Sequence, residues 1–248
     1  MNREATDLAG VRTISYETLG STNAEALSRA RTGERGPLWV VAQRQSEGRG
    51  RRGRAWVSPP GNLYATLLLC EPSAPAQAPQ LSFVAALALH DALCECAPRL
   101  GPALRLKWPN DLLLGGAKLA GILIEGDSEP QFACAIGIGV NCASHPPATD
   151  HPATDLAAAG AEVTPERLFA ALASAMERRL AQWQRGQGFA SVRADWLKRA
   201  AGLGEPIRVR LPERELSGRF EGLDEGGRLL LGTSDGVTPV TAGEVFGL

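Results

Sequence analysis

Four arginines lie among three glycines between Gly48 and Trp56, in the order Gly-Arg-Gly-Arg-Arg-Gly-Arg-Ala-Trp. Glycine lets backbone N–H groups approach a ligand closely. Arginine supplies planar, permanently charged donors that match phosphate and carboxylate oxygens. We therefore expect this segment, called the arginine loop below, to bind an anion such as a nucleotide or an acyl phosphate.

The arginine loop has three other interpretations. Its glycines match the dinucleotide fingerprint G-x-G-x-x-G, but arginines fill the spacers and the Pro-containing residues 55–61 do not open a helix. A nucleic-acid-binding arm needs a broad basic footprint, whereas the chain carries a net charge of −1 and no second basic cluster of this density. The third interpretation is a solvated turn without function, although the neighbouring Trp56 argues against it.

Further polar residues gather where strands are expected to end. Because strand ends are fixed by a rigid sheet, such residues can converge on one site. Some have structural alternatives: Ser21 and Thr22 can cap a helix, Asn110 and Asp111 can cap a turn, and Lys118 can be a surface lysine. The clusters are Ser21-Thr22-Asn23, Gln45, residues 107–111, Lys118 with Gly121, and Asn141.

Composition excludes several protein classes. Hydrophobic residues make up 44% and charged residues 21% of the chain, which is ordinary for a globular protein. No apolar run approaches the roughly 18 residues that span a bilayer, and the first ten residues lack the apolar core of a signal peptide. We therefore expect a cytoplasmic protein. Its five cysteines are odd in number, which argues against a disulfide framework, and Cys94-Glu95-Cys96 is better explained by buried thiols than by a zinc site.

Strands and helices alternate along residues 1–202, which predicts one α+β domain built on a mixed sheet with helices on one face. Capping signals place helix starts at Ser21 and at Thr164-Pro165. Strands are expected at 11–17, 38–42, 62–69, 104–108, 111–114, 118–125 and 132–141, and helices after Ser21 and at 81–97, 164–183 and 188–199.

Composition changes after Gly204. Four short strands, separated by Gly and Asp turns, are expected at 207–210, 216–223, 228–231 and 237–240. This pattern predicts a small β-barrel domain over residues 203–248.

Five motifs, taken in order, resemble those of biotin protein ligases. The resemblance covers nearly the whole chain and implies a class II synthetase-like biotin/lipoate ligase catalytic domain followed by an SH3-like barrel. It also implies a form without the N-terminal DNA-binding domain, because few residues precede the first expected strand. The chain departs from the family at Glu47, where we expect the acid to pair with a loop arginine. The motifs are Ser-Thr-Asn, Gln-x-x-Gly-Arg-Gly-Arg-Arg-Gly-Arg-x-Trp, Lys-Trp-Pro-Asn-Asp, Lys-Leu-Ala-Gly-Ile-Leu-Ile-Glu and Gly-Ile-Gly-Val-Asn.

The resemblance implies a two-step biotin–[acetyl-CoA-carboxylase] ligase. Biotin and ATP give biotinyl-5′-AMP and pyrophosphate, and a lysine of the biotin carboxyl carrier protein then takes the biotin and releases AMP. The implied catalytic residues are Lys118, Arg49 and Arg51. The implied biotin-binding residues are Ser21, Thr22, Asn23, Gln45, Arg49, Gly50, Arg51, Lys118 and Gly121. The implied nucleotide-binding residues are Arg51, Arg52, Arg54, Trp56, Asn110, Asp111, Lys118 and Asn141, with Asp111 also holding Mg²⁺ through water.

Two other functions stay open on the sequence. A lipoate ligase or octanoyl transferase shares this architecture and also acylates a carrier lysine. A binding module could sequester an adenylate without transferring it. The expected partners are biotin, ATP and the carrier protein, with no nucleic acid and no membrane. A homodimer is compatible with the sequence, for example through an edge strand near residues 104–107.

Overall fold

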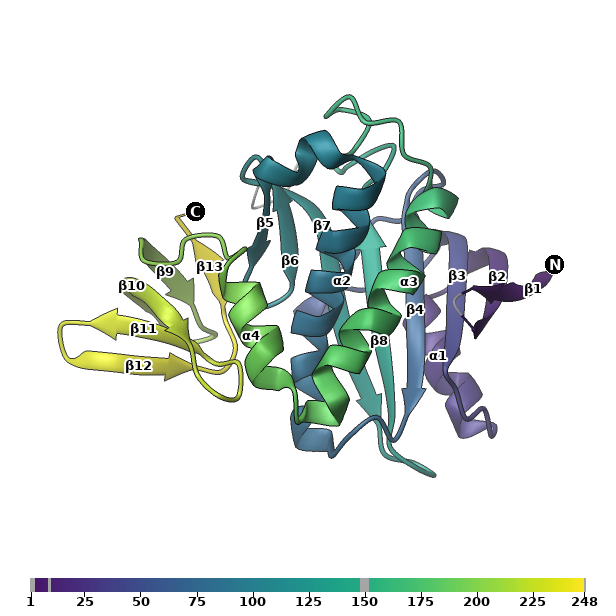
Figure 1. Ribbon diagram of the computed structural model, residues 1–248, viewed down its shortest axis with the longest axis horizontal. Coiled ribbons are helices and arrows are strands. Elements are labelled where there is room, and N and C mark those ends of the chain that lie inside the picture. Colours follow the sequence, from purple (N-terminus) through teal and green to yellow (C-terminus); the bar gives the residue numbers. More distant parts are fainter. Residues whose placement is uncertain (1–2, 9, 148–151, 248) are drawn as a thin grey trace.

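The computed structural model describes residues 3–8, 10–147 and 152–247. Within these residues an eight-stranded mixed sheet carries helices, and a five-stranded antiparallel sheet follows it along the chain (Figure 1). Among the described residues, no helix combines the length and apolarity that a bilayer-crossing helix needs.

The main sheet has the strand order β1-β2-β3-β4-β8-β7-β6-β5. Strands β2 and β3 pair in parallel, and the other neighbours pair in antiparallel fashion. Strand β1 was not expected from the sequence; it pairs with β2 at the edge of the sheet. The strands are β1 (Arg3–Leu8), β2 (Val11–Leu19), β3 (Leu38–Gln45), β4 (Leu63–Cys70), β5 (Leu104–Lys107), β6 (Asp111–Leu114), β7 (Ala117–Asp127) and β8 (Ala133–Val140).

Helices cover both faces of the main sheet, so the prediction of helices on one face is wrong. Helix α1 (Thr22–Arg31) packs with Val40 and Ala135, whereas α2 (Leu81–Cys96) and α3 (Pro165–Trp183) share the other core with Ile136. Successive strand residues point to opposite faces, which puts Ala135 and Ile136 in different cores. Helix α1 connects the parallel strands β2 and β3 and lies behind the sheet in Figure 1.

The capping signals in the sequence are confirmed. The Ser21 side chain accepts a hydrogen bond from the Ala24 N–H at the start of α1. Thr164 accepts from Arg167 at the start of α3, with Pro165 in the first turn. Both helices therefore begin where their local sequence specifies. Short 3₁₀ turns lie at Arg51–Gly53, Pro75–Gln80, Pro98–Ala103 and Gln184–Gly186.

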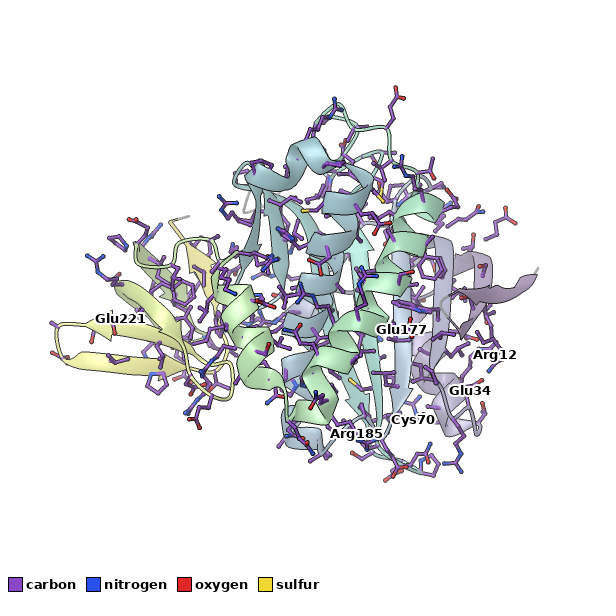
Figure 2. The ribbon with its side chains drawn as sticks, in the orientation of Figure 1. Arg12, Glu34, Cys70, Glu177, Arg185 and Glu221 are labelled. Atoms are coloured by element: carbon purple, nitrogen blue, oxygen red, sulfur yellow. The ribbon has the colours of Figure 1, made fainter. Side chains whose placement is uncertain are left out.

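The chain that leaves α1 is tied to the sheet through Glu34. Its carboxylate pairs with Arg12 of β2, and its carbonyl oxygen accepts from Cys70 Sγ at 3.4 Å. Figure 2 shows these three side chains near one another at the α1 end of the molecule. The contacts fix α1 over β3 and β4, and with it the Ser-Thr-Asn segment at its N-terminus.

The C-terminal sheet has the order β12-β11-β10-β9-β13 and is open rather than a closed barrel. Its terminal strands β12 and β13 do not pair with each other in the described residues, which corrects the predicted barrel. Strand β13 was missed because it is only three residues long. The strands are β9 (Pro206–Arg210), β10 (Glu215–Leu223), β11 (Leu229–Thr233), β12 (Gly236–Val240) and β13 (Glu244–Phe246).

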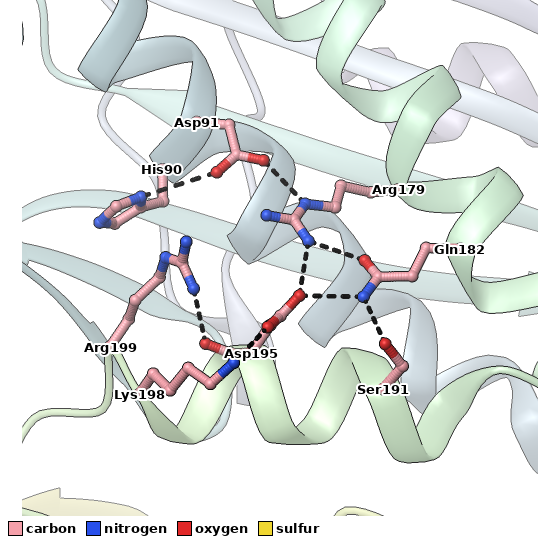
Figure 3. Close-up of polar contacts among 8 residues, drawn as sticks. All are labelled: His90, Asp91, Arg179, Gln182, Ser191, Asp195, Lys198 and Arg199. Carbon is pink, nitrogen blue, oxygen red and sulfur yellow. Dashed lines mark hydrogen bonds and ion pairs between the residues drawn. The ribbon is translucent and has the colours of Figure 1, made fainter.

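A polar network joins α2, α3 and α4 (Phe189–Leu197). Arg179 of α3 donates to Asp91 of α2 at 2.7 Å and to Asp195 of α4 at 3.0 Å (Figure 3). Burial opposes ionisation of Asp91, but the bonds from His90 and Arg179 outweigh it and lower the pKa to about 2. These bonds fix helix α4 against α2 and α3.

The segment after α4 covers part of the β5 edge. The Leu106 N–H donates to the Arg199 carbonyl, and the Ala201 N–H donates to the Leu106 carbonyl, both at 2.8 Å. These backbone groups are therefore not free to pair with a second copy. The suggested dimer contact near residues 104–107 is wrong at Leu106, because the chain leaving α4 runs alongside β5 in parallel.

Candidate active site

A cavity of about 440 Å³ lies on the face of β7 and β8 next to the N-terminus of α1. Its walls come from separate segments: the start of α1, the end of β3 with the arginine loop, the turn between β5 and β6, the residues after β8, and the start of β13. The structure thus brings together segments that are far apart in the sequence. The predicted residues that line it are Ser21, Asn23, Gln45, Arg49, Gly50, Arg51, Arg52, Arg54, Trp56, Asn110, Asp111, Lys118, Gly121 and Asn141.

Three glycines, Gly121, Gly137 and Gly139, form the cavity floor. A Cβ at Gly139 would lie 2.6 Å from Trp56 Nε1, and one at Gly121 would lie 3.1 Å from the Trp56 ring. The Trp56 indole therefore lies over backbone that only glycine leaves bare. Its Nε1 is buried with no hydrogen-bond acceptor among the described residues.

Backbone hydrogen bonds close the arginine loop on itself. The Trp56 N–H donates to the Gly48 carbonyl at 2.8 Å, and the Gly50 N–H donates to the Arg54 carbonyl at 2.7 Å. At the tip, Arg52 and Gly53 have φ values of 58° and 70°, in the left-handed region. The loop is a compact turn whose four arginines line the cavity, and it contains no helix of the dinucleotide-binding kind.

Carboxylates neutralise three of the cations around the cavity. Lys118 Nζ lies 2.7 Å from Asp111 Oδ1, and Arg49 Nη2 lies 3.3 Å from Glu125. Arg54 pairs with Glu244 of β13. Neither Glu244 nor Glu125 was expected as a partner from the sequence, although Glu125 ends the Lys-Leu-Ala-Gly-Ile-Leu-Ile-Glu motif.

The expected pairing of Glu47 with a loop arginine is wrong for the described residues. Glu47 lies beside Gly20, whose carbonyl accepts from the Glu47 N–H at 2.8 Å. The loop arginines Arg49 and Arg54 instead reach Glu125 and Glu244. Glu47 therefore leaves the charge of the arginine loop unchanged.

Arg51, Arg52 and Lys107 are the cavity cations whose positive charge meets no carboxylate at ion-pair distance within the described residues. Of these, Arg52 is exposed, Arg51 is half-buried and Lys107 is buried. Arg51 donates to Asn110 Oδ1 at 3.1 Å and to the Gly243 carbonyl at 3.4 Å, both neutral acceptors. Burial lowers the pKa of Arg51, and it also lowers the pKa of Lys107, which is only 6% exposed. The half-buried Arg51 and the buried Lys107, each without a carboxylate partner, are suited to an anionic ligand. Lys107 belongs to one of the polar clusters seen in the sequence but was assigned no catalytic or binding role there, because a lysine between Leu106 and Trp108 carries no signal of its orientation.

At the other end of the cavity the walls are polar but neutral. Gln45 Oε1 accepts from the Thr22 N–H at 2.8 Å, and Gln45 Nε2 donates to Ser58 Oγ at 3.1 Å. Thr22 is 4% exposed and, unlike the other predicted site residues, does not line the cavity. It lies behind Gln45, whose amide it contacts through its backbone N–H, and its expected contact with biotin stays a prediction.

Lys118 is fixed by its backbone on both sides. A β-bulge between β6 and β7 places Leu113 opposite Lys118 and Leu112 opposite Ala120. On its other side the Lys118 N–H donates to the Pro152 carbonyl at 2.7 Å, and the Thr154 N–H donates to the Lys118 carbonyl. Lys118 is therefore a positioned residue and not a surface lysine.

The two asparagines have structural contacts as well as a place in the cavity wall. Asn110 Nδ2 donates to the Ile122 carbonyl at 2.7 Å, while its Oδ1 accepts from Arg51. Asn141 Nδ2 donates to the Thr154 carbonyl at 3.0 Å. Each asparagine thus positions a cation of the site: Asn110 contacts Arg51 directly, and Asn141 secures the segment beside Lys118.

The comparisons with known proteins agree on one family. Residues 18–141 match the Biotin/lipoate A/B protein ligase family, and residues 202–247 match the Biotin protein ligase C terminal domain. The chain is 48% identical over 236 residues to a biotin–[acetyl-CoA-carboxylase] ligase of Paracoccus denitrificans, a match that covers 91% of this chain and 96% of the relative.

More distant relatives and solved structures belong to the same family of ligases. The chain is 32% identical to the bifunctional ligase/repressor BirA of Escherichia coli, over 92% of this chain and 71% of that protein. The solved biotin protein ligase of Aquifex aeolicus in complex with biotin and ATP matches with a TM-score of 0.78 and 26% identity, over 94% of this chain and 97% of that one.

Proposed function

The chain belongs to the biotin/lipoate A/B protein ligase family, and we propose that it is a biotin–[acetyl-CoA-carboxylase] ligase. It converts biotin and ATP to biotinyl-5′-AMP and pyrophosphate, and then transfers the biotinyl group to a lysine of the biotin carboxyl carrier protein. The observation that carries the proposal is the polarity of the cavity, which runs from neutral amide groups at Gln45 to cations at Lys118, Arg51 and Lys107. Biotin has the same polarity: a neutral ureido ring, an apolar tail and a carboxylate that meets the ATP phosphates.

Biotin binding is assigned to the neutral end. Ser21, Asn23 and Gln45 offer polar groups to the ureido ring, with Thr22 supporting Gln45 from behind. The bare backbone of Gly121 leaves room for the tail, and Gly50 lines the wall beside it. A mostly apolar slot with a few placed polar groups is the usual form of such a site.

The first step joins two anions, so it needs fixed positive charge. Lys118, Arg49 and Arg51 are the proposed catalytic residues, because they can offset the charge of the carboxylate and of the α-phosphate as the new P–O bond forms. The carboxylate oxygen attacks the α-phosphorus, and the bond to the departing pyrophosphate breaks. In the free chain Lys118 and Arg49 are paired with Asp111 and Glu125, so substrate anions must compete for them.

The nucleotide is assigned to the cationic end. Trp56 offers an aromatic face for the adenine, and Asn110 and Asn141 offer amide groups. Arg52 and Arg54 extend the positive charge of the arginine loop, and Arg51 with Lys107 suits the pyrophosphate, because neither cation has a carboxylate partner of its own in the described residues.

Asp111 fits a Mg²⁺ ion that accompanies the phosphates. Its Oδ1 is buried and receives no aligned hydrogen bond within the described residues, although Lys118 Nζ is close. Mg²⁺ is commonly bound through one or two carboxylates, several waters and the substrate phosphates. Asp111 would hold the ion through water, and the ion would offset phosphate charge.

The second step requires that the adenylate survive until the carrier lysine arrives. The arginine loop and the start of β13 both line the cavity and are linked to each other by Arg54 and Glu244. Excluding water slows hydrolysis of the mixed anhydride. The carrier protein as partner, a catalytic domain over residues 1–202 with a second domain over 203–248, a cytoplasmic location and the absence of nucleic-acid binding stay predictions, as does the homodimer.

The test is exchange of labelled pyrophosphate into ATP, with biotin or lipoate as the acid. Exchange that depends on biotin, followed by labelling of a carrier lysine, supports the proposal. Exchange that depends on lipoate alone would make the chain a lipoate ligase. No exchange with either acid would leave a binding module that holds an adenylate without making it.

A further inference from the structure

A line of buried side-chain oxygens runs behind the neutral end of the cavity. Gln45 Oε1 lies 3.1 Å from Thr22 Oγ1, Thr22 Oγ1 lies 2.7 Å from Thr66 Oγ1, and Thr66 Oγ1 lies 2.7 Å from Asn23 Oδ1. Thr66, at the centre of β4, is 0% exposed and does not line the cavity.

The orientation of both amides is fixed by their other contacts. Gln45 Oε1 faces the Thr22 N–H, and Gln45 Nε2 faces Ser58 Oγ, whose own proton goes to the Trp56 carbonyl. Asn23 Nδ2 faces the Leu123 carbonyl and Glu125 Oε2. Both ends of the line are therefore carbonyl oxygens, which accept hydrogen bonds and cannot donate.

The line is one proton short. It has three oxygen–oxygen contacts, but only Thr22 and Thr66 supply a hydroxyl proton. A contact of 2.7 Å between two oxygens requires a proton between them, so we assign the two protons to the two shorter contacts: Thr66 donates to Asn23, and Thr22 donates to Thr66. The longer contact, between Thr22 Oγ1 and Gln45 Oε1, has no proton, so Gln45 Oε1 keeps one lone pair for another donor.

We propose that Thr66 is a positioning residue that makes the site selective for a ring carrying N–H donors. By accepting the Thr22 proton, Thr66 prevents that hydroxyl from occupying Gln45 Oε1 and leaves the oxygen for a ligand N–H. The inference rests on the proposed function, in which that ligand group is the ureido ring of biotin. The same line continues through Asn23 to Glu125, which also pairs with Arg49, so it joins the ring end of the site to a cation of the carboxylate end.

The test compares Thr66→Val, which keeps the shape and removes the hydroxyl, with Thr66→Ser, which keeps the hydroxyl. In Thr66→Val the Thr22 proton turns to Gln45 Oε1 and competes with the ligand. We expect the KM for biotin in pyrophosphate exchange to rise about tenfold, the order of one lost hydrogen bond. The KM for ATP should change by less than about twofold. In Thr66→Ser the KM for biotin should stay near that of the unmodified chain.

Octanoate separates this role from a general loss of structure, because it has the tail and carboxylate of the substrate but no ring N–H. As a competitive inhibitor it should keep its inhibition constant in Thr66→Val. An unchanged KM for biotin, a parallel weakening of octanoate, or failure of Thr66→Ser to restore the KM would overturn the inference. If Thr66→Val does not fold, Thr66→Cys against Thr66→Ser makes the same comparison of a poor with a good donor. Absence of biotin-dependent exchange in the unmodified chain would instead reject the proposed function.

Discussion

Lys118 Nζ lies 2.7 Å from Asp111 Oδ1 across the neighbouring strands β7 and β6, and 5.4 Å from the centre of the Trp56 ring. The lysine proposed to act on the reacting phosphate is thus paired, in the free chain, with the carboxylate proposed to hold Mg²⁺ through water. Substrate binding must exchange this partner for phosphate and carboxylate oxygens. The pair holds the Lys118 side chain in the cavity wall before any ligand enters.

Replacing Lys118 by Ala should slow adenylation far more than it weakens biotin binding. A charge that acts mainly in the transition state contributes about 2 to 4 kcal/mol, which corresponds to on the order of a hundredfold or more in rate. Pyrophosphate exchange measures the rate, and calorimetry measures biotin affinity. Lys198→Ala, at an exposed lysine of the same chain, is the control. An exchange rate equal to that of the control would remove Lys118 from the catalytic residues.

Replacing Arg51 by Ala should release biotinyl-5′-AMP from the enzyme. Arg51 links the arginine loop to Asn110 and to the Gly243 carbonyl, so its loss opens the side of the cavity that faces β13. Dissociation of pre-formed adenylate, followed by stopped flow, should be at least about tenfold faster, the order expected for one charge-assisted hydrogen bond. Arg44→Ala, at an exposed arginine near the end of β3, is the matched control, and equal rates in the two variants would contradict the closing role of Arg51.

Replacing Lys107 by Met should stabilise the protein while impairing ATP use. Burial lowers the pKa of Lys107, which means that the folded state disfavours its charged form. Removing that buried charge should raise the free energy of unfolding by about 1 to 3 kcal/mol. The KM for ATP should rise and the KM for biotin should not. A lower Tm, or equal changes in both KM values, would show that Lys107 is structural.

The Arg179 network should make stability depend on pH in the acid range. Hydrogen bonds from Gln182 and other partners lower the pKa of Asp195 to about 2, and those from His90 and Arg179 lower the pKa of Asp91 to about 2. Because both folded pKa values lie below the ordinary value, the stabilisation is complete above about pH 4 and is lost as the pH falls through about 2.

Arg179→Met should therefore lower the Tm at pH 7 and flatten the fall in Tm between about pH 4 and pH 2. Thermal unfolding followed by circular dichroism measures both effects. Arg178→Met, at the exposed neighbouring position of α3, should keep the unmodified profile. If both variants lose stability in parallel across this range, the network does not cause the pH dependence.

The sequence by itself determined the local elements and the residues that gather at the site. Ser21 and Thr164 start their helices because a side-chain oxygen at that position satisfies a free backbone N–H. The glycines of the arginine loop and of β8 permit backbone shapes and close approaches that side chains forbid. Such signals act over a few residues, so they can be recognised from the order of residues along the chain alone.

Only the tertiary structure decided how these residues are partnered. Glu125 lies 76 residues from Arg49 and Glu244 lies 190 from Arg54, and no local pattern joins them. That Lys107 faces the cavity while Thr22 lies behind its wall depends on strand register and on the placement of α1. Register and packing are set by contacts between distant segments, since a strand presents its alternate residues to whichever surfaces its neighbours provide.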